Sequence, residues 1–267
     1  GEGNEDYAAI QIAPTEDPTS PYLAPQGAPA NPTDHLGHNV ALSPDGSLAA
    51  INGIASATDW WPPYLDIRDA RTGEVLSHHE LVYDDSGLFP SGAVGIHPEW
   101  SPSGDRIAVA LAFDDGTDTE DWGCIWTSET CRSHIAVIPH LGGGQLDSPA
   151  IVVEQSGMDY HFYPTWSPDG RWLAFASARL EALGADQKSE SNPNAVLRMV
   201  RSTGGPYACP GPECYELTNA TQYSWDDALA GNGRQSTWPK FTPFAQGETN
   251  NVFFISFNTK IDYGLLT

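Results

Sequence analysis

One pattern recurs four times along the chain: a short apolar stretch, a Ser/Thr-Pro turn and a second, strongly apolar stretch. The copies are NVALSPDGSLAAI (39–51), PEWSPSGDRIAVALAF (98–113), PTWSPDGRWLAFAS (164–177) and PKFTPFAQGETNNVFFISF (239–257), the last with an enlarged turn. Their prolines, Pro44, Pro102, Pro168 and Pro243, are spaced by 58, 66 and 75 residues. Because a four-stranded β unit of a repeat protein takes roughly 40–45 residues, each repeat has room for one such unit and an insertion.

The turn and the stretch after it each carry structural information. Ser-Pro-Asp-Gly is typical of a hairpin turn, because proline presets φ, aspartate bonds the backbone ahead and glycine takes a positive φ. The following stretch is apolar on both faces, as in Ile107–Phe113 and Leu173–Ala176. Such a strand is buried between two sheets, whereas a sandwich strand would alternate more cleanly. The repeat therefore predicts an all-β propeller of four-stranded antiparallel blades.

WSPDGRWLAFAS, residues 166–177, resembles the repeat of TolB-like (WD-repeat-like) β-propellers. In that family the second strand is followed by a loop, a third strand, a turn that contains glycine and a fourth strand. Downstream segments that match this order occur in three units. In the third unit they are Ala195–Val200, Arg201–Gly205 and Tyr215–Asn219, and in the second Ile135–Ile138, Gly142–Gly144 and Ala150–Val153. In the first unit they are Tyr64–Ile67, Thr72-Gly73 and a strand near Leu81. The resemblance covers roughly 37–267 and implies a periplasmic, cell-surface or secreted protein.

The repeat divides the chain into about three and a half blades, at roughly 37–84, 95–155, 161–220 and 236–267. Propellers close with about four to eight blades, and an open ring exposes sheet edges. We therefore expect either that the rest of the ring lies in a longer polypeptide or that a second chain completes it. Residues 1–36 lack the repeat and are rich in Pro, Gly and Ala, which predicts an extended N-terminal arm or a disordered tail.

The charge balance limits the classes of partner. The chain has 35 Asp and Glu against 12 Lys and Arg, a net charge of -23. Such a surface repels nucleic acid and anionic lipid, and it favours cations or a basic protein, although acidity also serves solubility alone. No apolar run reaches the roughly 18 residues that a membrane span needs. The sequence thus excludes nucleic acid as a partner, and it excludes a membrane-spanning segment.

The four cysteines form two close pairs, Cys124/Cys131 and Cys209/Cys214, in turn-rich segments. Neither pair has the spacing of a zinc site. Two local disulfides are the favoured interpretation, which implies an oxidising compartment; four free thiols in a cytosolic protein are the alternative.

The longest insertions fall on one end of the predicted blades. They join strands two and three, or one blade to the next, at roughly 55–63, 84–97, 114–134, 155–163, 177–194 and 220–238. Aromatic residues of this face are predicted to contact a peptide or sugar, or else to cap the propeller: Trp60, Trp61, Tyr64, Trp122, Trp126, Tyr160, Tyr163 and Trp225. Function in propellers resides in loops, so this loop-rich face is the candidate site.

Two possible metal sites stand out in the sequence. Residues 114–121 hold five carboxylates, Asp114, Asp115, Asp118, Glu120 and Asp121, which suit calcium or simply form a solvated acidic loop. His38, His97 and His161 each precede a repeat turn and either line up to bind a transition metal or serve structural roles between blades.

These features favour a non-enzymatic extracytoplasmic propeller that binds a protein or peptide through its loop-rich face. The sequence has no GxSxG elbow, HExxH or Walker motif. TolB-like blades also form the propeller of secreted prolyl-oligopeptidase-type hydrolases, which is the first alternative. A carbohydrate-binding propeller, suggested by the aromatic residues, is the second.

Overall fold

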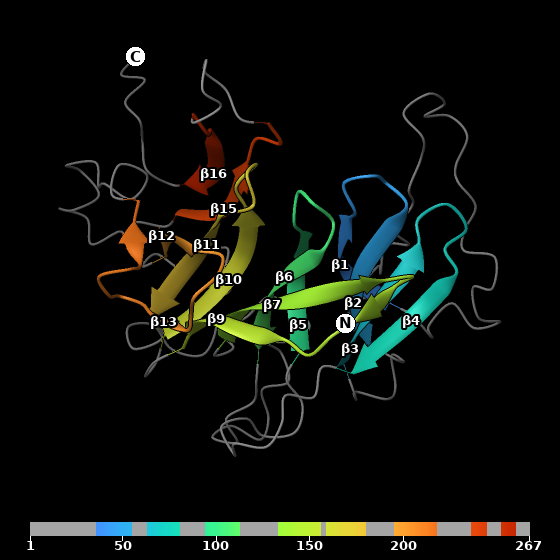
Figure 1. Cartoon of the computed structure of the whole chain (residues 1–267). Helices are drawn as coiled ribbons and strands as arrows, with labels where there is room; N and C mark the ends of the chain where they lie inside the picture. Colours follow the sequence, from blue (N-terminus) through green and yellow to red (C-terminus); the bar gives the residue numbers. More distant parts are fainter. Residues whose placement is uncertain are drawn as a thin grey trace, which may run out of the picture.

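A computed structural model of the chain describes residues 36–54, 63–80, 94–112, 133–155, 159–179, 195–217, 236–244 and 252–259. All regular elements within these ranges are β-strands, and they form successive antiparallel sheets (Figure 1). These described ranges contain no helix long and apolar enough to cross a membrane. The predicted all-β class is confirmed, and four-stranded sheets recur as propeller blades require. The N-terminal arm lies outside the described residues.

Blade 1 shows how the repeat sequence forms its first hairpin. Its strands are β1 (Leu36–Leu42), β2 (Leu48–Ile54), β3 (Pro63–Asp69) and β4 (Val75–Glu80), paired antiparallel in that order. In the turn between β1 and β2, the Asp45 carboxylate accepts from Ser43 Oγ at 2.6 Å and from the Ser47 backbone N–H at 3.0 Å. Gly46 takes a φ of 70°, which strains residues with a side chain. The predicted roles of aspartate, which bonds the backbone ahead, and of glycine, which takes a positive φ, are therefore confirmed in this turn.

Blade 3 repeats this topology over the best-matching stretch of sequence. It contains β10 (Asp159–Trp166), β11 (Trp172–Arg179), β12 (Val196–Arg201) and β14 (Tyr215–Glu216), again in sequence order. The central strand β11 is buried on both faces, with Leu173, Phe175 and Ala176 fully enclosed. This is the burial that its continuous apolar run predicts.

Blade 2 receives a strand from the neighbouring repeat. Its own strands are β5 (Val94–Trp100), β6 (Arg106–Ala112), β7 (Ser133–Gly142) and β9 (Ala150–Glu154), with the short β8 (Gln145–Leu146) paired to β7. Strand β13 (Tyr207–Ala208) lies between β12 and β14 of blade 3 in sequence but pairs in parallel with β9 of blade 2. We call residues 203–214 the strap. A Cβ at Gly205 would lie 2.5 Å from the Val152 carbonyl oxygen, so the strap needs glycine there to approach β9.

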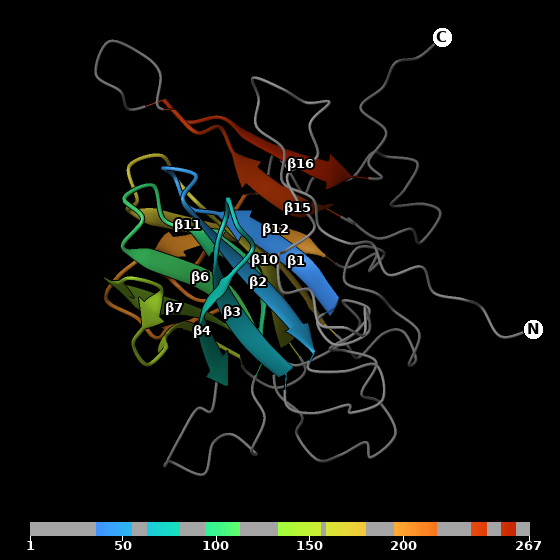
Figure 2. The same ribbon diagram turned by 90° about the vertical axis from the view of Figure 1, so that its right-hand side faces the viewer.

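The remaining described strands, β15 (Ser236–Phe241) and β16 (Ile255–Thr259), form a hairpin. The first strands of the four units are neighbours in space: β1 contacts β5, β5 contacts β10, and β10 contacts β15. We call β1, β5, β10 and β15 the inner strands. Figure 2 shows blade 1 in front of the other sheets, with the β15–β16 hairpin along one side of the stack. This side-by-side order of first strands is that of propeller blades around an axis.

The tryptophan of the repeat joins blade 2 to blade 1 and blade 3 to blade 2. Trp100 donates its indole N–H to the Ala41 carbonyl oxygen at 3.1 Å, and Trp166 donates to that of Glu99 at 2.9 Å. Both side chains are buried, as predicted for core positions. Leu42 takes the same place in blade 1 and is 46% exposed. At these two interfaces, apolar packing between blades is thus combined with a directed hydrogen bond from the indole N–H.

Candidate binding site on the inner strands

Three inner strands, β5, β10 and β15, carry the same irregularity within the strand. In each, a residue with a ring stands before a proline: His97-Pro98, Tyr163-Pro164 and Trp238-Pro239. The three residues have φ values of 52°, 54° and 56°, and the pairing register shifts at each of them. A residue before proline normally favours extended backbone, and a positive φ is uncommon outside glycine. Such outliers concentrate at functional sites, which makes this position the first candidate.

The left-handed backbone brings the three rings together. The ring centroids of His97 and Tyr163 are 4.0 Å apart and their planes are tilted by 44°. Those of Tyr163 and Trp238 are 4.2 Å apart and nearly parallel, at 26°. Three residues that are far apart in the sequence therefore form one column across β5, β10 and β15. We call it the ring column.

Exposure differs sharply along the ring column. His97 and Tyr163 are only 7% and 6% exposed, whereas Trp238 is 46% exposed. Each buried ring is covered by its neighbour, and Trp238 is the last member among the described residues. A large rigid ring, supported from one side and open on the other, is the kind of group that anchors binding partners.

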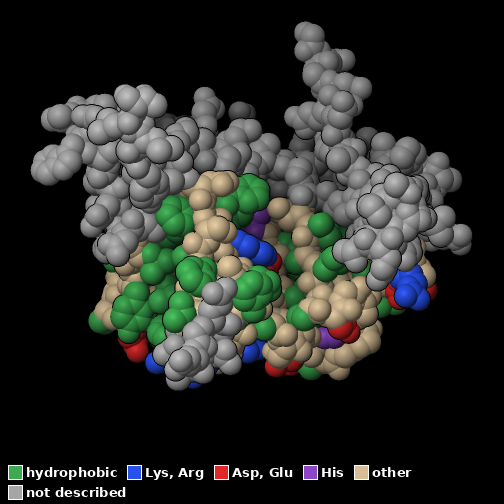
Figure 3. Space-filling view, turned by 90° about the horizontal axis from the view of Figure 1, so that it is seen from above, with side chains coloured by type: hydrophobic (Ala, Val, Ile, Leu, Met, Phe, Trp, Pro, Cys, Tyr) green, Lys and Arg blue, Asp and Glu red, His purple; other side chains and the backbone are tan. Residues whose placement is uncertain are grey.

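An ion pair lies on the same strands, two residues along from the ring column. Lys240 Nζ of β15 contacts the Glu99 carboxylate of β5, so the pair joins the hairpin to blade 2 across the inner strand of blade 3. The side chain of Lys240 remains 58% exposed and that of Glu99 22%. Seen from above, hydrophobic side chains gather on one part of the described surface, and basic side chains lie near a histidine close to its middle (Figure 3).

A second polar cluster lies buried between blades 2 and 3. Ser133 Oγ donates to the His161 carbonyl oxygen at 2.5 Å and accepts from its backbone N–H at 2.9 Å, while His161 Nδ1 lies 3.1 Å from Ser177 Oγ. Burial, with smaller repulsion from Arg198 and His134, lowers the pKa of His161 to about 3. Burial also lowers the pKa of His134 to about 4, and its Nδ1 accepts from a backbone N–H. Both rings are neutral at physiological pH and serve to bond neighbouring strands.

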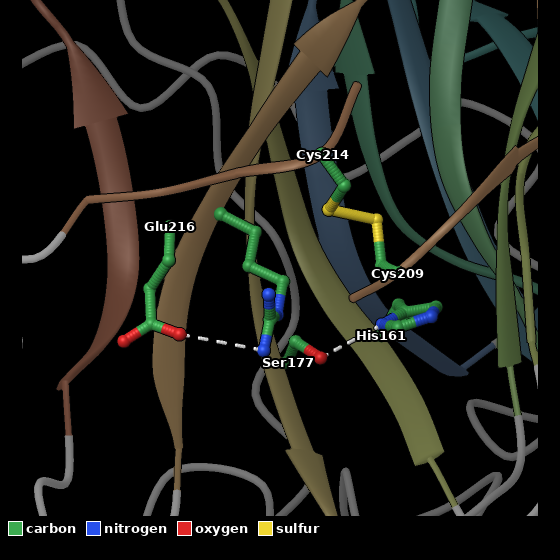
Figure 4. The surroundings of a disulfide bond; sticks show 6 residues. His161, Ser177, Cys209, Cys214 and Glu216 are labelled. Carbon is green, nitrogen blue, oxygen red and sulfur yellow. Dashed lines mark hydrogen bonds and ion pairs between the residues drawn. A yellow bond between two sulfur atoms is a disulfide. The ribbon is translucent and has the colours of Figure 1, made fainter. Parts of the chain in front are cut away.

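The disulfide of the strap adjoins this cluster. Cys209 and Cys214 are bonded, with Cα atoms 5.5 Å apart, and both are buried. Figure 4 shows the disulfide with His161 and Ser177 in its surroundings. This pair is the predicted local one, whereas Cys124 and Cys131 lie outside the described residues.

The metal site, one of the two interpretations of His38, His97 and His161, is not assembled in the described part of the chain. His97 belongs to the ring column, while His161 is fully buried between blades. The structural role that the sequence left as an alternative is the one that His161 has. The described ranges contain no group of three or more His, Cys, Asp or Glu residues placed to hold a metal. The predicted calcium ligands, Asp114, Asp115, Asp118, Glu120 and Asp121, fall outside those ranges.

Two of the predicted ligand-face aromatics need correction. Tyr160 and Tyr163 are 2% and 6% exposed and pack in the core between blades, because β10 is an inner strand covered on both sides. Tyr163 instead supports the exposed ring of Trp238. Tyr64 lies on β3. The others, Trp60, Trp61, Trp122, Trp126 and Trp225, fall outside the described residues.

Sequence reasoning missed Trp238 itself, although a signal was present. The runs His97–Trp100 (HPEW), Tyr163–Trp166 (YPTW) and Trp238–Phe241 (WPKF) share a ring residue, a proline and a second ring at fixed spacing. A repeated ring-Pro pair at one position of a repeat identifies a shared environment. The positive φ that brings the rings together has no sequence signature, because none of the three residues is glycine.

No family model and no curated protein matches the chain. The solved structures it resembles include an oligogalacturonate lyase in complex with manganese (15% identity, TM-score 0.39, covering 70% of this chain and 43% of the lyase). They also include prolyl oligopeptidase B from Galerina marginata bound to a 35mer substrate (10%, 0.44, 90% and 27%) and a putative TolB from Agrobacterium tumefaciens (14%, 0.31, 68% and 73%). The chain spans less than half of the first two. At these scores the fold assignment depends on the strand topology.

Proposed function

We propose that this chain belongs to an extracytoplasmic β-propeller of the TolB-like type that binds a protein or peptide at the inner strands. The observation that carries the proposal is the half-exposed ring of Trp238, stacked on the buried ring of Tyr163. Tryptophan supplies a large contact area with few rotatable bonds, so it loses little entropy on binding. The column below it holds the ring in place before a partner arrives, which lowers the cost of ordering.

Two further features support this assignment. In sequence, the predicted insertions at 84–97, 155–163 and 220–238 lead into the inner strands β5, β10 and β15, so we propose that the partner also contacts the loop-rich face. The buried disulfide favours an oxidising compartment. The TolB-like resemblance of residues 166–177 implies the same setting. Further blades or a second chain that complete the ring are proposed to pack against this same open side of Trp238, the last described member of the ring column.

Selection from a random peptide library displayed on phage tests the proposal. We expect enriched peptides that bind the wild-type chain and lose affinity for Trp238→Ala. Phe254→Ala is the matched control, because Phe254 is 50% exposed on the same hairpin but does not belong to the ring column. Enriched peptides that bind both variants like wild type would place the binding surface elsewhere, and failure to enrich any peptide would contradict peptide binding.

A further inference from the structure

We infer that the end of β9 is a pH-sensitive latch: when the buried histidines His134 and His161 gain protons, the strap separates from blade 2 before the rest of the chain unfolds. We call residues Val152–Gln155 the latch. Three observations carry this inference, and none of them involves the proposed binding site. They are the hydrogen bond at the end of the latch, a second histidine on its other side, and the narrow contact that holds the strap.

A histidine side chain continues the pairing of β7 with β9. The last backbone pair joins Ile135 to Val153, and beyond it the backbone N–H of Gln155 donates to His134 Nδ1 at 2.9 Å. An imidazole nitrogen accepts a hydrogen bond only while it carries no proton. Protonation of His134 Nδ1 therefore breaks this bond and places two donors against each other.

A second histidine meets the latch from blade 3. His161 of β10 is fully buried, and the hydroxyl of Ser133, the neighbour of His134 in sequence, bonds to its backbone. Burial lowers the pKa of His161 most, and the charges of Arg198 and His134 lower it further. The backbone of Glu154, within the latch, opposes this lowering of the pKa. Protons on both histidines therefore repel each other beside the latch, close to the strap disulfide (Figure 4).

The charges around the two histidines offer little compensation for added protons. The described titratable side chains at this end of the surrounding elements are Arg198 of β12, Glu216 of β14, Glu154 of β9, Tyr160 of β10 and Tyr207 of β13. Arg198 and Glu216 are paired at 3.5 Å and balance each other. The Glu154 side chain is exposed, so solvent screens it. Protonation thus adds net positive charge to a buried contact, which favours a state that admits water.

The strap depends on the latch through a narrow contact. Strand β13 pairs in parallel with β9 only through Tyr207–Ala208 and Val153–Glu154. The bond of Gln155 to His134 follows directly after these two pairs. A contact of this length depends on its neighbours for stability, and such elements open at a lower free energy than the core does. Loss of the bond therefore releases the residues that hold the strap.

Acid favours the opened latch because the histidines regain their ordinary pKa in water. Burial lowers the pKa of His134 to about 4, from an ordinary value of 6.5. Once the latch opens, His134 meets water and its pKa returns to that value. At pH 5, about 1.5 units below it, the opened latch is favoured about 30-fold more than at pH 8. Exposure of His161 adds to this factor, since burial lowers its pKa to about 3.

Hydrogen exchange of the native protein at pH 8 and pH 5, divided by the intrinsic exchange rate at each pH, measures the opening. We expect the protection of residues 150–155 and 203–214 to fall at least about 30-fold, unchanged by about 0.5 M urea. Strand β2 should stay more protected and should exchange through urea-dependent unfolding. His134→Gln keeps an acceptor without titrating, so it should remove about 30-fold of the fall. His140→Gln is the matched control, because His140 also belongs to β7 but bonds to Gly104.

Three results would overturn the latch. The first is protection of the strap that is equal at pH 8 and pH 5. The second is exchange of the strap and of β2 with one free energy and one urea dependence at both pH values, because the strap would then open only with the whole chain. The third is a fall in His134→Gln as large as in wild type. If that variant fails to fold, His161→Asn replaces it, and the urea dependence of the wild type decides by itself whether the opening is local.

Discussion

Acidification is expected to destabilise this protein well above the pH at which its carboxylates titrate. The cause is the pair of buried histidines between blades 2 and 3. Burial lowers the pKa of His134 to about 4 and that of His161 to about 3, from an ordinary value of 6.5. At pH values between 6.5 and these lowered pKa values, the unfolded chain binds more protons than the folded one. Stability is therefore full above pH 6.5 and falls as the pH falls.

The magnitude follows from the same values. At pH 5 each histidine of the unfolded chain is about 1.5 pH units below its pKa, which stabilises the unfolded state by about 2 kcal/mol per residue. Two histidines give about 4 kcal/mol, a large part of the roughly 5–15 kcal/mol that domains possess. Protonation of carboxylates, which relieves the repulsion within a chain at -23, becomes important only near pH 4. The window from pH 8 to pH 5 therefore isolates the histidines.

Urea denaturation at a series of pH values between 8 and 5 measures this loss. The His134→Gln variant should lose only about half as much free energy of unfolding across the window, whatever its absolute stability. Val200→Ala is the matched control, because it removes buried apolar atoms and no titrating group, so its pH dependence should equal that of wild type. A wild-type stability that changes by less than about 1 kcal/mol would refute the reasoning.

Three other perturbations test separate parts of the structure. Trp166→Ala should lower the free energy of unfolding by about 3–5 kcal/mol in denaturant titrations. Trp166→Phe keeps an aromatic ring and loses the hydrogen bond to Glu99, so it should lower the free energy of unfolding less. A small loss for the alanine variant would contradict the packing of Trp166 between blades 2 and 3. Replacing Cys209 and Cys214 together by serine should cost about 2 kcal/mol, and no change would mean that the strap is ordered without its disulfide. Calcium titration calorimetry should give heat with wild type and none after substitution of the 114–121 carboxylates by amides; equal responses would place calcium elsewhere.

The repeat units were predictable because their signals are local. Ser43, Pro44, Asp45 and Gly46 specify a turn through their own side chains and φ values, and that turn formed as predicted. The strongly apolar stretch of β11 likewise predicted a strand buried on both faces. Trp100 and Trp166 were expected in the core because each adjoins the turn, and both are buried.

Features that depend on neighbouring blades were not predictable in this way. Strand β13 joins the sheet of blade 2 through the parallel pairing of Tyr207 with Val153. Neither residue has a local sequence feature that predicts this pairing. Tyr160 and Tyr163 resemble exposed loop aromatics in the sequence, yet packing between blades buries them. Trp238 is exposed for the opposite reason, since it ends the ring column. The candidate site thus depends on how inner strands meet, which no single segment specifies.

The side-by-side arrangement of the inner strands β5, β10 and β15 is tested most directly by a zero-length cross-link. Lys240 and Glu99 are separated by 141 residues in sequence and form an ion pair between the hairpin and blade 2. Carbodiimide activation followed by proteolysis and mass spectrometry should yield an amide between these two side chains, and Glu99→Gln should abolish it. Recovery of Lys240 joined only to other carboxylates would contradict the arrangement of inner strands, and with it the site that they form.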